Sequence, residues 1–218
     1  MVKLHADKEM KKLGFLIVDD EALIREGLHA LLEREVFVKK ILAASNASEF
    51  KEQLGLGIDV VLMDFRLQES NGLDLILYSK QRQPDTKIIA ITGLEGTELV
   101  LNLLKVGVHG IVYKLAGYSE IVKTIKEVSE NGSYFSDKIM DVIRENAHRW
   151  DGIPPVVLNF PEHELLMAIA SGLTTKQIAG RLKMSPATAE TYRIRLIKKV
   201  GVHNTAGLLA YAYRNGIL

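Results

Sequence analysis

Between residues 13 and 131, short apolar runs alternate with segments whose apolar residues recur at helical spacing. The runs are almost uncharged, which is typical of strands buried on both faces of a parallel sheet. The expected strands are Leu13–Val18, Phe37–Ala43, Val60–Met63, Lys87–Ile91 and Gly110–Tyr113. The expected helices are Ala22–Glu33, Ser48–Leu54, Leu73–Arg82, Thr97–Val106 and Ser119–Glu130. This alternation predicts an α/β fold with a doubly wound, five-stranded parallel sheet of the flavodoxin-like kind. The functional crevice should then lie beyond the carboxyl ends of the strands.

After Asn131 and Gly132 the strand pattern disappears. An amphipathic segment from Ser136 to Arg149 predicts a further helix, and the glycine and paired prolines within residues 150–155 predict a linker. From residue 158 only helical spacing remains. The helices expected there are Glu162–Ala170, Thr175–Leu182, Pro186–Val200 and Thr205–Asn215. The pattern thus predicts a first domain over residues 1–131, a linker with a helix over 132–157, and a small all-α domain over 158–218.

Capping signals define two neighbouring helices of the C-terminal region. Thr174 and Gln177 form a capping box, Ser185 precedes Pro186 at the start of the next helix, and Gly201 follows its end. Two short helices joined by so tight a turn predict a helix-turn-helix.

Composition limits the function classes. The chain has 218 residues, of which 47% are hydrophobic, and this length suits two modest domains. It has no cysteine, which excludes disulfides, thiolate zinc sites and thiol nucleophiles and fits a reducing cytoplasm. No apolar run reaches about 18 residues and the N-terminus lacks a signal-peptide pattern, so we expect a cytoplasmic protein without a membrane segment.

The net charge of +1 conceals an uneven distribution. Residues 158–218 contain eight basic and three acidic side chains, a net charge of +5, whereas the rest of the chain has 20 basic and 24 acidic side chains, a net charge of −4. A basic helical segment attached to an acidic body favours a polyanion as its partner, although a solvated charged face is the simpler alternative.

Polar side chains follow four of the expected strands. Asp19 and Asp20 follow the first, Asp64 the third, Thr92 the fourth and Lys114 the fifth. Parallel strands place their carboxyl ends at one edge, so these side chains should converge. Three carboxylates in one crevice would repel one another without a cation, and such oxygen ligands suit Mg²⁺. Alone, each residue has a plain structural explanation, such as helix capping; together they indicate a site.

The segments around these residues resemble the receiver domain of two-component response regulators. The similarity lies in Phe15–Glu21, Val60–Leu67, Ile91–Gly93 and Gly110–Lys114. It implies that Asp64 is the phosphoacceptor and that Asp19, Asp20, Asp64 and the backbone carbonyl of Arg66 hold Mg²⁺. It further implies that Thr92 and Lys114 bind the phosphoryl group, and that a sensor histidine kinase is the partner.

Two positions depart from the receiver pattern. Gln68 stands where the family usually has proline, and Ile111 occupies the switch position, where the family has an aromatic residue, while Tyr113 lies next to Lys114. We hypothesise that the usual coupling between threonine and the aromatic residue is weakened or replaced in this chain.

The C-terminal segment resembles the LuxR-type helix-turn-helix, and the whole chain resembles the NarL/FixJ family of response regulators. The similarity lies in Glu162–Leu166, Gly172–Ala179 and Lys199–Val202. It implies a transcription factor that binds double-stranded DNA as a homodimer and is not an enzyme beyond its own phosphorylation and dephosphorylation. The expected DNA contacts are Lys176, Thr188, Glu190, Thr191, Arg193, Arg195, Lys198 and Lys199.

Two alternatives remain at this level. One is a DNA-binding regulator whose receiver is atypical and independent of phosphorylation, which Ile111 and Gln68 favour. The other is a hydrolase that forms an aspartyl phosphate; such enzymes commonly have an acid two residues after the nucleophile, where this chain has Arg66.

Overall fold

The structure, a computed structural model, describes residues 12–67, 70–93, 96–150, 156–215 and 217. A five-stranded parallel sheet forms the centre of the N-terminal part, with the spatial order β2-β1-β3-β6-β7. Its strands are β1 (Leu13–Val18), β2 (Val38–Ala44), β3 (Val60–Asp64), β6 (Lys87–Thr92) and β7 (Gly110–Tyr113). The predicted doubly wound α/β fold is confirmed, with strand ends within one residue of those expected.

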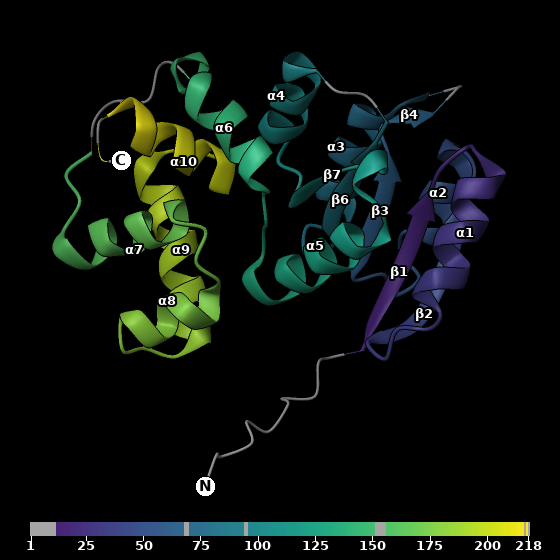
Figure 1. Cartoon of the computed structure of the whole chain (residues 1–218), viewed down its shortest axis with the longest axis horizontal. Helices are drawn as coiled ribbons and strands as arrows, with labels where there is room; N and C mark the ends of the chain where they lie inside the picture. Colours follow the sequence, from purple (N-terminus) through teal and green to yellow (C-terminus); the bar gives the residue numbers. More distant parts are fainter. Residues whose placement is uncertain (1–11, 68–69, 94–95, 151–155, 216, 218) are drawn as a thin grey trace, which may run out of the picture.

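Five helices cover the two faces of the sheet (Figure 1). They are α1 (Ala22–Leu32), α2 (Ala47–Gln53), α3 (Gly72–Arg82), α4 (Thr97–Val106) and α5 (Tyr118–Asn131). Buried side chains of α1 and α5 share an apolar cluster with Phe15 and Ile17 of β1, whereas those of α2, α3 and α4 share the opposite cluster with Leu16 and Val18. The alternation of strand residues therefore builds a core on each side of the sheet.

The described part of the chain continues into six helical segments on one side of the sheet domain (Figure 1). They are α6 (Asp137–Glu145), the 3₁₀ turn η2 (Ala147–Arg149), α7 (Phe160–Ala170), α8 (Thr175–Arg181), α9 (Pro186–Val200) and α10 (Thr205–Arg214). The expected linker helix is thus a helix followed by a separate 3₁₀ turn. Of the expected linker itself, residues 151–155 lie outside the described residues.

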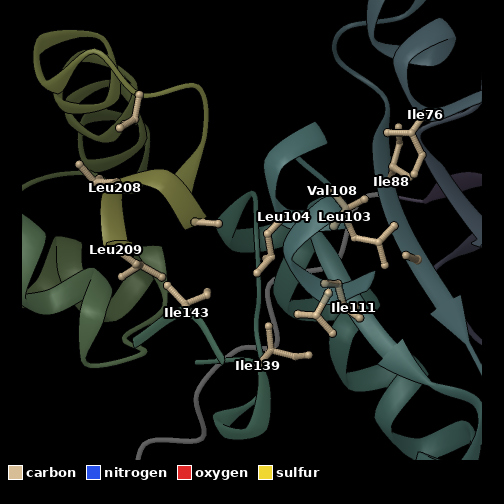
Figure 2. Close-up of a cluster of buried hydrophobic side chains, with 14 of the residues drawn as sticks. Ile76, Ile88, Leu103, Leu104, Val108, Ile111, Ile139, Ile143, Leu208 and Leu209 are labelled. Carbon is tan, nitrogen blue, oxygen red and sulfur yellow. The ribbon is translucent and has the colours of Figure 1, made fainter. Parts of the chain in front are cut away.

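An apolar cluster runs without interruption from the sheet into the C-terminal helices. Figure 2 shows Leu104 and Ile111 of the sheet domain beside Ile139 of α6, and Ile143 of α6 beside Leu209 of α10. All five side chains are buried. The helix α6 is therefore an apolar bridge that holds α10 against α4 and fixes how the two parts of the chain sit together.

A short antiparallel hairpin was not expected from the sequence. Its strands β4 (Arg66–Leu67) and β5 (Ser70–Asn71) follow β3 directly. Gln68, one of the two departures from the receiver pattern, lies outside the described residues. Within the described part of the chain, no helix combines the length and apolar character that crossing a membrane requires.

Candidate functional site

Three aspartates converge at the carboxyl edge of the sheet. Asp19 follows β1 and Asp64 ends β3, the neighbouring strand, and both are buried, with exposed fractions of 2% and 4%. Asp20 is partly buried beside them. One carboxylate oxygen of each aspartate lies within 4.8 Å of those of the other two. The strand topology therefore brings together acidic groups that are 45 residues apart in the sequence.

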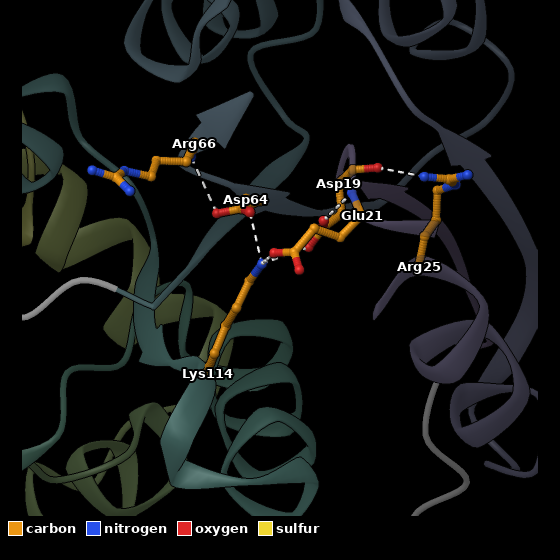
Figure 3. Close-up of polar contacts among 6 residues, drawn as sticks. All are labelled: Asp19, Glu21, Arg25, Asp64, Arg66 and Lys114. Atoms are coloured by element: carbon orange, nitrogen blue, oxygen red, sulfur yellow. Dashed lines mark hydrogen bonds and ion pairs between the residues drawn. The ribbon is translucent and has the colours of Figure 1, made fainter. Parts of the chain in front are cut away.

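Lys114 is the cation at the centre of this cluster (Figure 3). Its Nζ lies 2.7 Å from Asp64 Oδ2, 3.0 Å from Asp19 Oδ2 and 3.0 Å from Glu21 Oε1. Burial by itself would lower the pKa of the Lys114 ammonium, but the hydrogen bonds that it donates to Asp64, Glu21 and Asp19 outweigh burial and raise this pKa above its usual value. Lys114 is therefore held in its charged form.

Backbone groups fix the orientation of the two buried carboxylates. The N–H of Glu21 donates to Asp19 Oδ1 at 2.9 Å, and the N–H of Arg66 donates to Asp64 Oδ1 at 3.1 Å. Desolvation raises the pKa of the Asp19 carboxyl, because these bonds and Lys114 do not fully compensate for burial. Excess negative charge in this crevice is therefore costly, and a divalent cation would relieve it.

The cluster opens into a cavity of about 680 Å³. The lining residues are Asp20, Glu21, Asp64, Arg66, Leu67, Gly93 and Lys114. Oxygen ligands within 4.8 Å of one another beside such a cavity fit a hexahydrated or partly hydrated Mg²⁺, which prefers few carboxylates and several waters. The residues present are thus compatible with the expected magnesium site. Arg66 lines the cavity, and a role for its carbonyl oxygen stays a prediction.

Thr92 and Ile111 occupy the strands beyond Asp64. Thr92 ends β6, next to β3, and is buried. Ile111, in β7, is also buried, in the apolar cluster that includes side chains of α6. Thr92 is thus at the same sheet edge as the acidic cluster, and Ile111 lies deeper in the core.

In the C-terminal region, α8 and α9 form the expected pair of helices. Thr174 and Gln177 make the reciprocal capping-box bonds, Ser185 Oγ accepts from Thr188 N–H at 3.0 Å, and Gly201 ends α9 with a φ of 80°. Buried Ile178 of α8 contributes to the core that holds this pair together. The local signals in the sequence therefore specify a helix-turn-helix.

Comparisons with known proteins agree with both parts of this geometry. The response regulator receiver domain matches residues 15–126, and the luxR family of bacterial regulatory proteins matches residues 158–212. The transcriptional regulatory protein MctR of Rhizobium johnstonii is 30% identical over 212 residues, which cover 96% of this chain and 97% of MctR. This chain is a response regulator of the luxR type. It belongs to a family of receiver-controlled, DNA-binding transcriptional regulators.

Two further relatives are similar over nearly the whole regulator. The DNA-binding transcriptional activator DevR/DosR of Mycobacterium tuberculosis is 28% identical, over 90% of this chain and 92% of its own. A solved structure of RcsB from Salmonella enterica serovar Typhimurium, bound to a promoter in the presence of the phosphomimetic BeF₃⁻, shares the fold with a TM-score of 0.56. It is 23% identical and covers 92% of this chain and 98% of the RcsB chain.

The regulator's helix α9 is docked onto its receiver. Arg193 of α9 donates hydrogen bonds to the main-chain carbonyl of Asn131, at the end of α5, and to Ser133 Oγ, and it pairs with Glu190 Oε1. Its side chain is only 11% exposed. Asn131 Oδ1 also accepts the N–H of Thr175 at 2.5 Å. In this arrangement the receiver therefore covers Arg193, and its expected DNA contact stays a prediction.

The other expected DNA contacts fall into two groups. Thr188 and Glu190 are partly buried like Arg193. Five side chains are exposed: Lys176, Thr191, Arg195, Lys198 and Lys199. Among these, Lys199 forms an ion pair with Glu162 at 2.5 Å. Part of the basic surface of the regulator is thus exposed to solvent, and the part that includes Arg193 is covered by the receiver.

Sequence reasoning missed three residues of the site and its docking contact. Glu21 is the third carboxylate that forms an ion pair with Lys114, and only its position directly after Asp20 could have indicated this contact. Arg25 donates to the carbonyl of Asp19 at 2.7 Å, one helical turn further on. For Asn131, the sequence carried only a helix-end signal, and its partners lie more than 40 residues away.

Proposed function

We propose that phosphorylation of Asp64 by a cognate sensor histidine kinase switches this regulator between a docked and a DNA-binding state. The observation that carries the proposal is the position of Asp64 Oδ2, 2.7 Å from Lys114 Nζ at the head of an open, acid-lined cavity. An oxygen of the Asp64 carboxylate attacks the phosphorus of a phosphohistidine, the N–P bond breaks, and an aspartyl phosphate forms.

The residues around Asp64 have two roles in this transfer, metal binding and binding of the phosphoryl oxygens. Asp19, Asp20, Asp64 and the carbonyl of Arg66 would hold Mg²⁺, which when bound offsets the charge on the incoming phosphoryl group. Lys114 already lies within ion-pair distance of Asp64 and can transfer its hydrogen bonds to phosphoryl oxygens. Thr92, buried at the neighbouring strand end, supplies a hydroxyl for the same group.

The docked contact of Arg193 connects the receiver to DNA binding. Arg193 is one of the residues expected to bind DNA phosphates, and in this arrangement Asn131 and Ser133 occupy its hydrogen-bonding groups. Phosphorylation needs to shift the free energy of the docking equilibrium by only about 1–3 kcal/mol to act as a useful switch. Release of α9 then lets Lys176, Thr188, Glu190, Thr191, Arg193, Arg195, Lys198 and Lys199 reach double-stranded DNA. RcsB, which shares this fold, has been solved bound to a promoter in the presence of a phosphomimetic, and this supports DNA binding in the activated state.

We take residues 1–131 as the receiver, 132–157 as the linker and 158–218 as the DNA-binding domain, acting as a homodimer on DNA because two copies roughly double the phosphate contacts. The receiver promotes only its own phosphorylation and dephosphorylation. A cysteine-free chain suits the cytoplasm, where the kinase would meet it.

Intact mass spectrometry after incubation with acetyl phosphate and Mg²⁺ tests the proposal. The native chain should gain one phosphoryl group and Asp64→Asn should gain none. Asp74→Asn, which changes an exposed aspartate of α3, is the matched control and should gain one. A native chain that takes up no phosphoryl group would instead support an atypical, phosphorylation-independent receiver, and continuous turnover of phosphoesters would support a hydrolase.

A further inference from the structure

Tyr113 lies beside the residue expected to sense the phosphoryl group. It ends β7, directly before Lys114, and pairs in register with Thr92 of β6. The preceding residues of the two strands, Ile91 and Val112, belong to the apolar cluster on the opposite face of the sheet. Because side chains alternate along a strand, Thr92 and Tyr113 therefore emerge as neighbours on the face that α4 and α6 cover.

On its other side, Tyr113 meets the linker helix. Lys138, in the first turn of α6, has its Nζ 4.5 Å from the centroid of the Tyr113 ring. Among the described residues this is the shortest distance from a cation to an aromatic ring. A cation this close to the face of a ring is attracted by its quadrupole. Tyr113 thus lies beside Thr92 at the carboxyl edge of the sheet and also contacts the linker helix α6.

Ile111 has the opposite character. It is 3% exposed and packs in the apolar cluster with Ile139 of α6 and Leu104 of α4 (Figure 2). It carries no polar atom and is enclosed on all sides, so a change of rotamer would leave a cavity. Ile111 is therefore a fixed contact for α6, whereas Tyr113 is only partly buried.

We propose that Tyr113, rather than the residue at position 111, transmits the phosphorylation state of Asp64 to the linker helix, and that Lys138 is the group that reads it. The proposal rests on phosphorylation of Asp64 as proposed above. When the hydroxyl of Thr92 turns to the phosphoryl group, the Tyr113 ring shifts towards the space beside Thr92 and leaves Lys138. The first turn of α6 then loses a contact, and the bridge that holds α10 and α9 against the receiver loosens.

The sequence pattern of this chain fits such a relay. The aromatic residue absent from position 111 stands two residues later on the same face of β7, closer to Lys114. Residues two positions apart in a strand point to the same face of the sheet, so positions 111 and 113 share a face. The ring at position 113 contacts the first turn of α6 instead of the buried part of the cluster. In this role Tyr113 is a positioning residue that acts through α6.

Three variants test the relay in the full chain: Tyr113→Leu, Lys138→Met and the double variant. The readout is the ratio of DNA affinities with and without beryllium trifluoride and Mg²⁺, measured on a duplex selected from a random-sequence pool with the activated native chain. Each single variant should reduce this ratio by about two- to fivefold, the value of one exposed cation–ring contact. The double variant should reduce it no further than the larger single effect. Tyr113→Phe keeps the ring and should keep the ratio.

Controls separate the relay from the phosphorylation itself. Lys51→Met removes a comparable contact, 5.3 Å from the Tyr78 ring, away from the linker helix, and should leave the ratio unchanged. All variants should gain one phosphoryl group from acetyl phosphate by intact mass. Lys138 is exposed, so Lys138→Met tests the relay even if Tyr113→Leu folds poorly. A normal mass gain with an unchanged ratio in Lys138→Met and Tyr113→Leu overturns the relay alone, whereas a native chain without a mass gain overturns the proposed function as well.

Discussion

The guanidinium group of Arg193, in the helix expected to enter DNA, donates a hydrogen bond to the main-chain carbonyl of Asn131, the residue on which α5 ends. The carbonyls at the C-terminus of a helix lack helical partners and carry partial negative charge, so they are good acceptors for a cation. Arg193 therefore finds on the receiver the kind of oxygen acceptor that a DNA phosphate would offer.

Asn131→Ala should loosen this contact and raise the DNA affinity of the unphosphorylated regulator. The substitution leaves the buried N–H of Thr175 without its acceptor in the docked state only, a cost of about 1–3 kcal/mol, or roughly 5- to 150-fold in affinity. Fluorescence anisotropy with a labelled duplex measures it. Asn46→Ala, which removes a cap on α2, is the control for general destabilisation and should not change the affinity. Equal affinities for native and Asn131→Ala chains would show that docking does not limit DNA binding.

Gly132→Ala should act in the same direction by steric displacement. Gly132 has a φ of 76°, and a Cβ built there would lie 1.9 Å from Arg193 Nη2, so Arg193 must move. Gly57→Ala introduces the same left-handed strain, at a φ of 68°, with nothing nearer than 3.5 Å. We expect both variants to lose about 1 kcal/mol of unfolding free energy from strain. Only Gly132→Ala should gain DNA affinity; a gain in both, or in neither, would remove the steric argument.

Lys114→Met should destabilise the receiver, because it leaves the buried carboxylates of Asp19 and Asp64 without their cation. Removing one partner from a buried ion pair typically costs about 3–5 kcal/mol. Thermal unfolding should show a lower Tm that Mg²⁺ partly restores, since the metal replaces the missing positive charge. Glu21→Gln removes the exposed partner of Lys114 and should cost less than about 1 kcal/mol. If Lys114→Met melts like the native chain, Lys114 does not offset the acidic cluster.

His109 should make the stability of the regulator depend on pH. Burial, together with Lys87, Lys80 and Arg193, lowers the pKa of His109 to about 3. Its Nδ1 also accepts the N–H of Ile88 at 3.0 Å, which requires that this nitrogen is unprotonated. The unfolded chain binds a proton below about pH 6.5 and the folded chain does not until about pH 3. His109 therefore contributes stability at neutral pH that is lost as the pH falls through this window, by about 1.4 kcal/mol per pH unit.

Denaturant unfolding between about pH 5 and 6.5 measures the contribution of His109. His109→Asn keeps an acceptor near the position of Nδ1 but cannot be protonated, so its unfolding free energy should fall less steeply with acid than that of the native chain. Parallel pH dependences in the two proteins would assign the acid sensitivity to other groups.

The fold could be predicted from the sequence wherever burial is periodic. The strands at Leu13–Val18 and Gly110–Tyr113 were predicted to the residue because their apolar runs face two cores. The capping bonds of Thr174 and Ser185 were predictable because they are local. Leucine spacing was less reliable on α1, where Leu23 resembles a core residue but is 82% exposed.

The candidate site was predictable to the extent that sheet topology is. Neighbouring parallel strands bring Asp19 and Asp64 together independently of the loop conformations, so the strand order alone predicts that these two side chains converge. The state of Arg193 was not predictable, because its partner Asn131 is 62 residues away and the contact depends on how two domains dock. A basic residue on a surface helix looks the same in a sequence whether it faces solvent, DNA or another domain.

DNA binding by the full-length regulator in two states tests the central claim most directly. The native chain and Asp64→Asn are titrated onto the same selected duplex, each with and without beryllium trifluoride and Mg²⁺. We expect the native chain to bind more tightly with the phosphoryl mimic, by about 5- to 150-fold, and Asp64→Asn to show no change. Equal affinity of the native chain with and without the mimic would contradict control of DNA binding through Asp64.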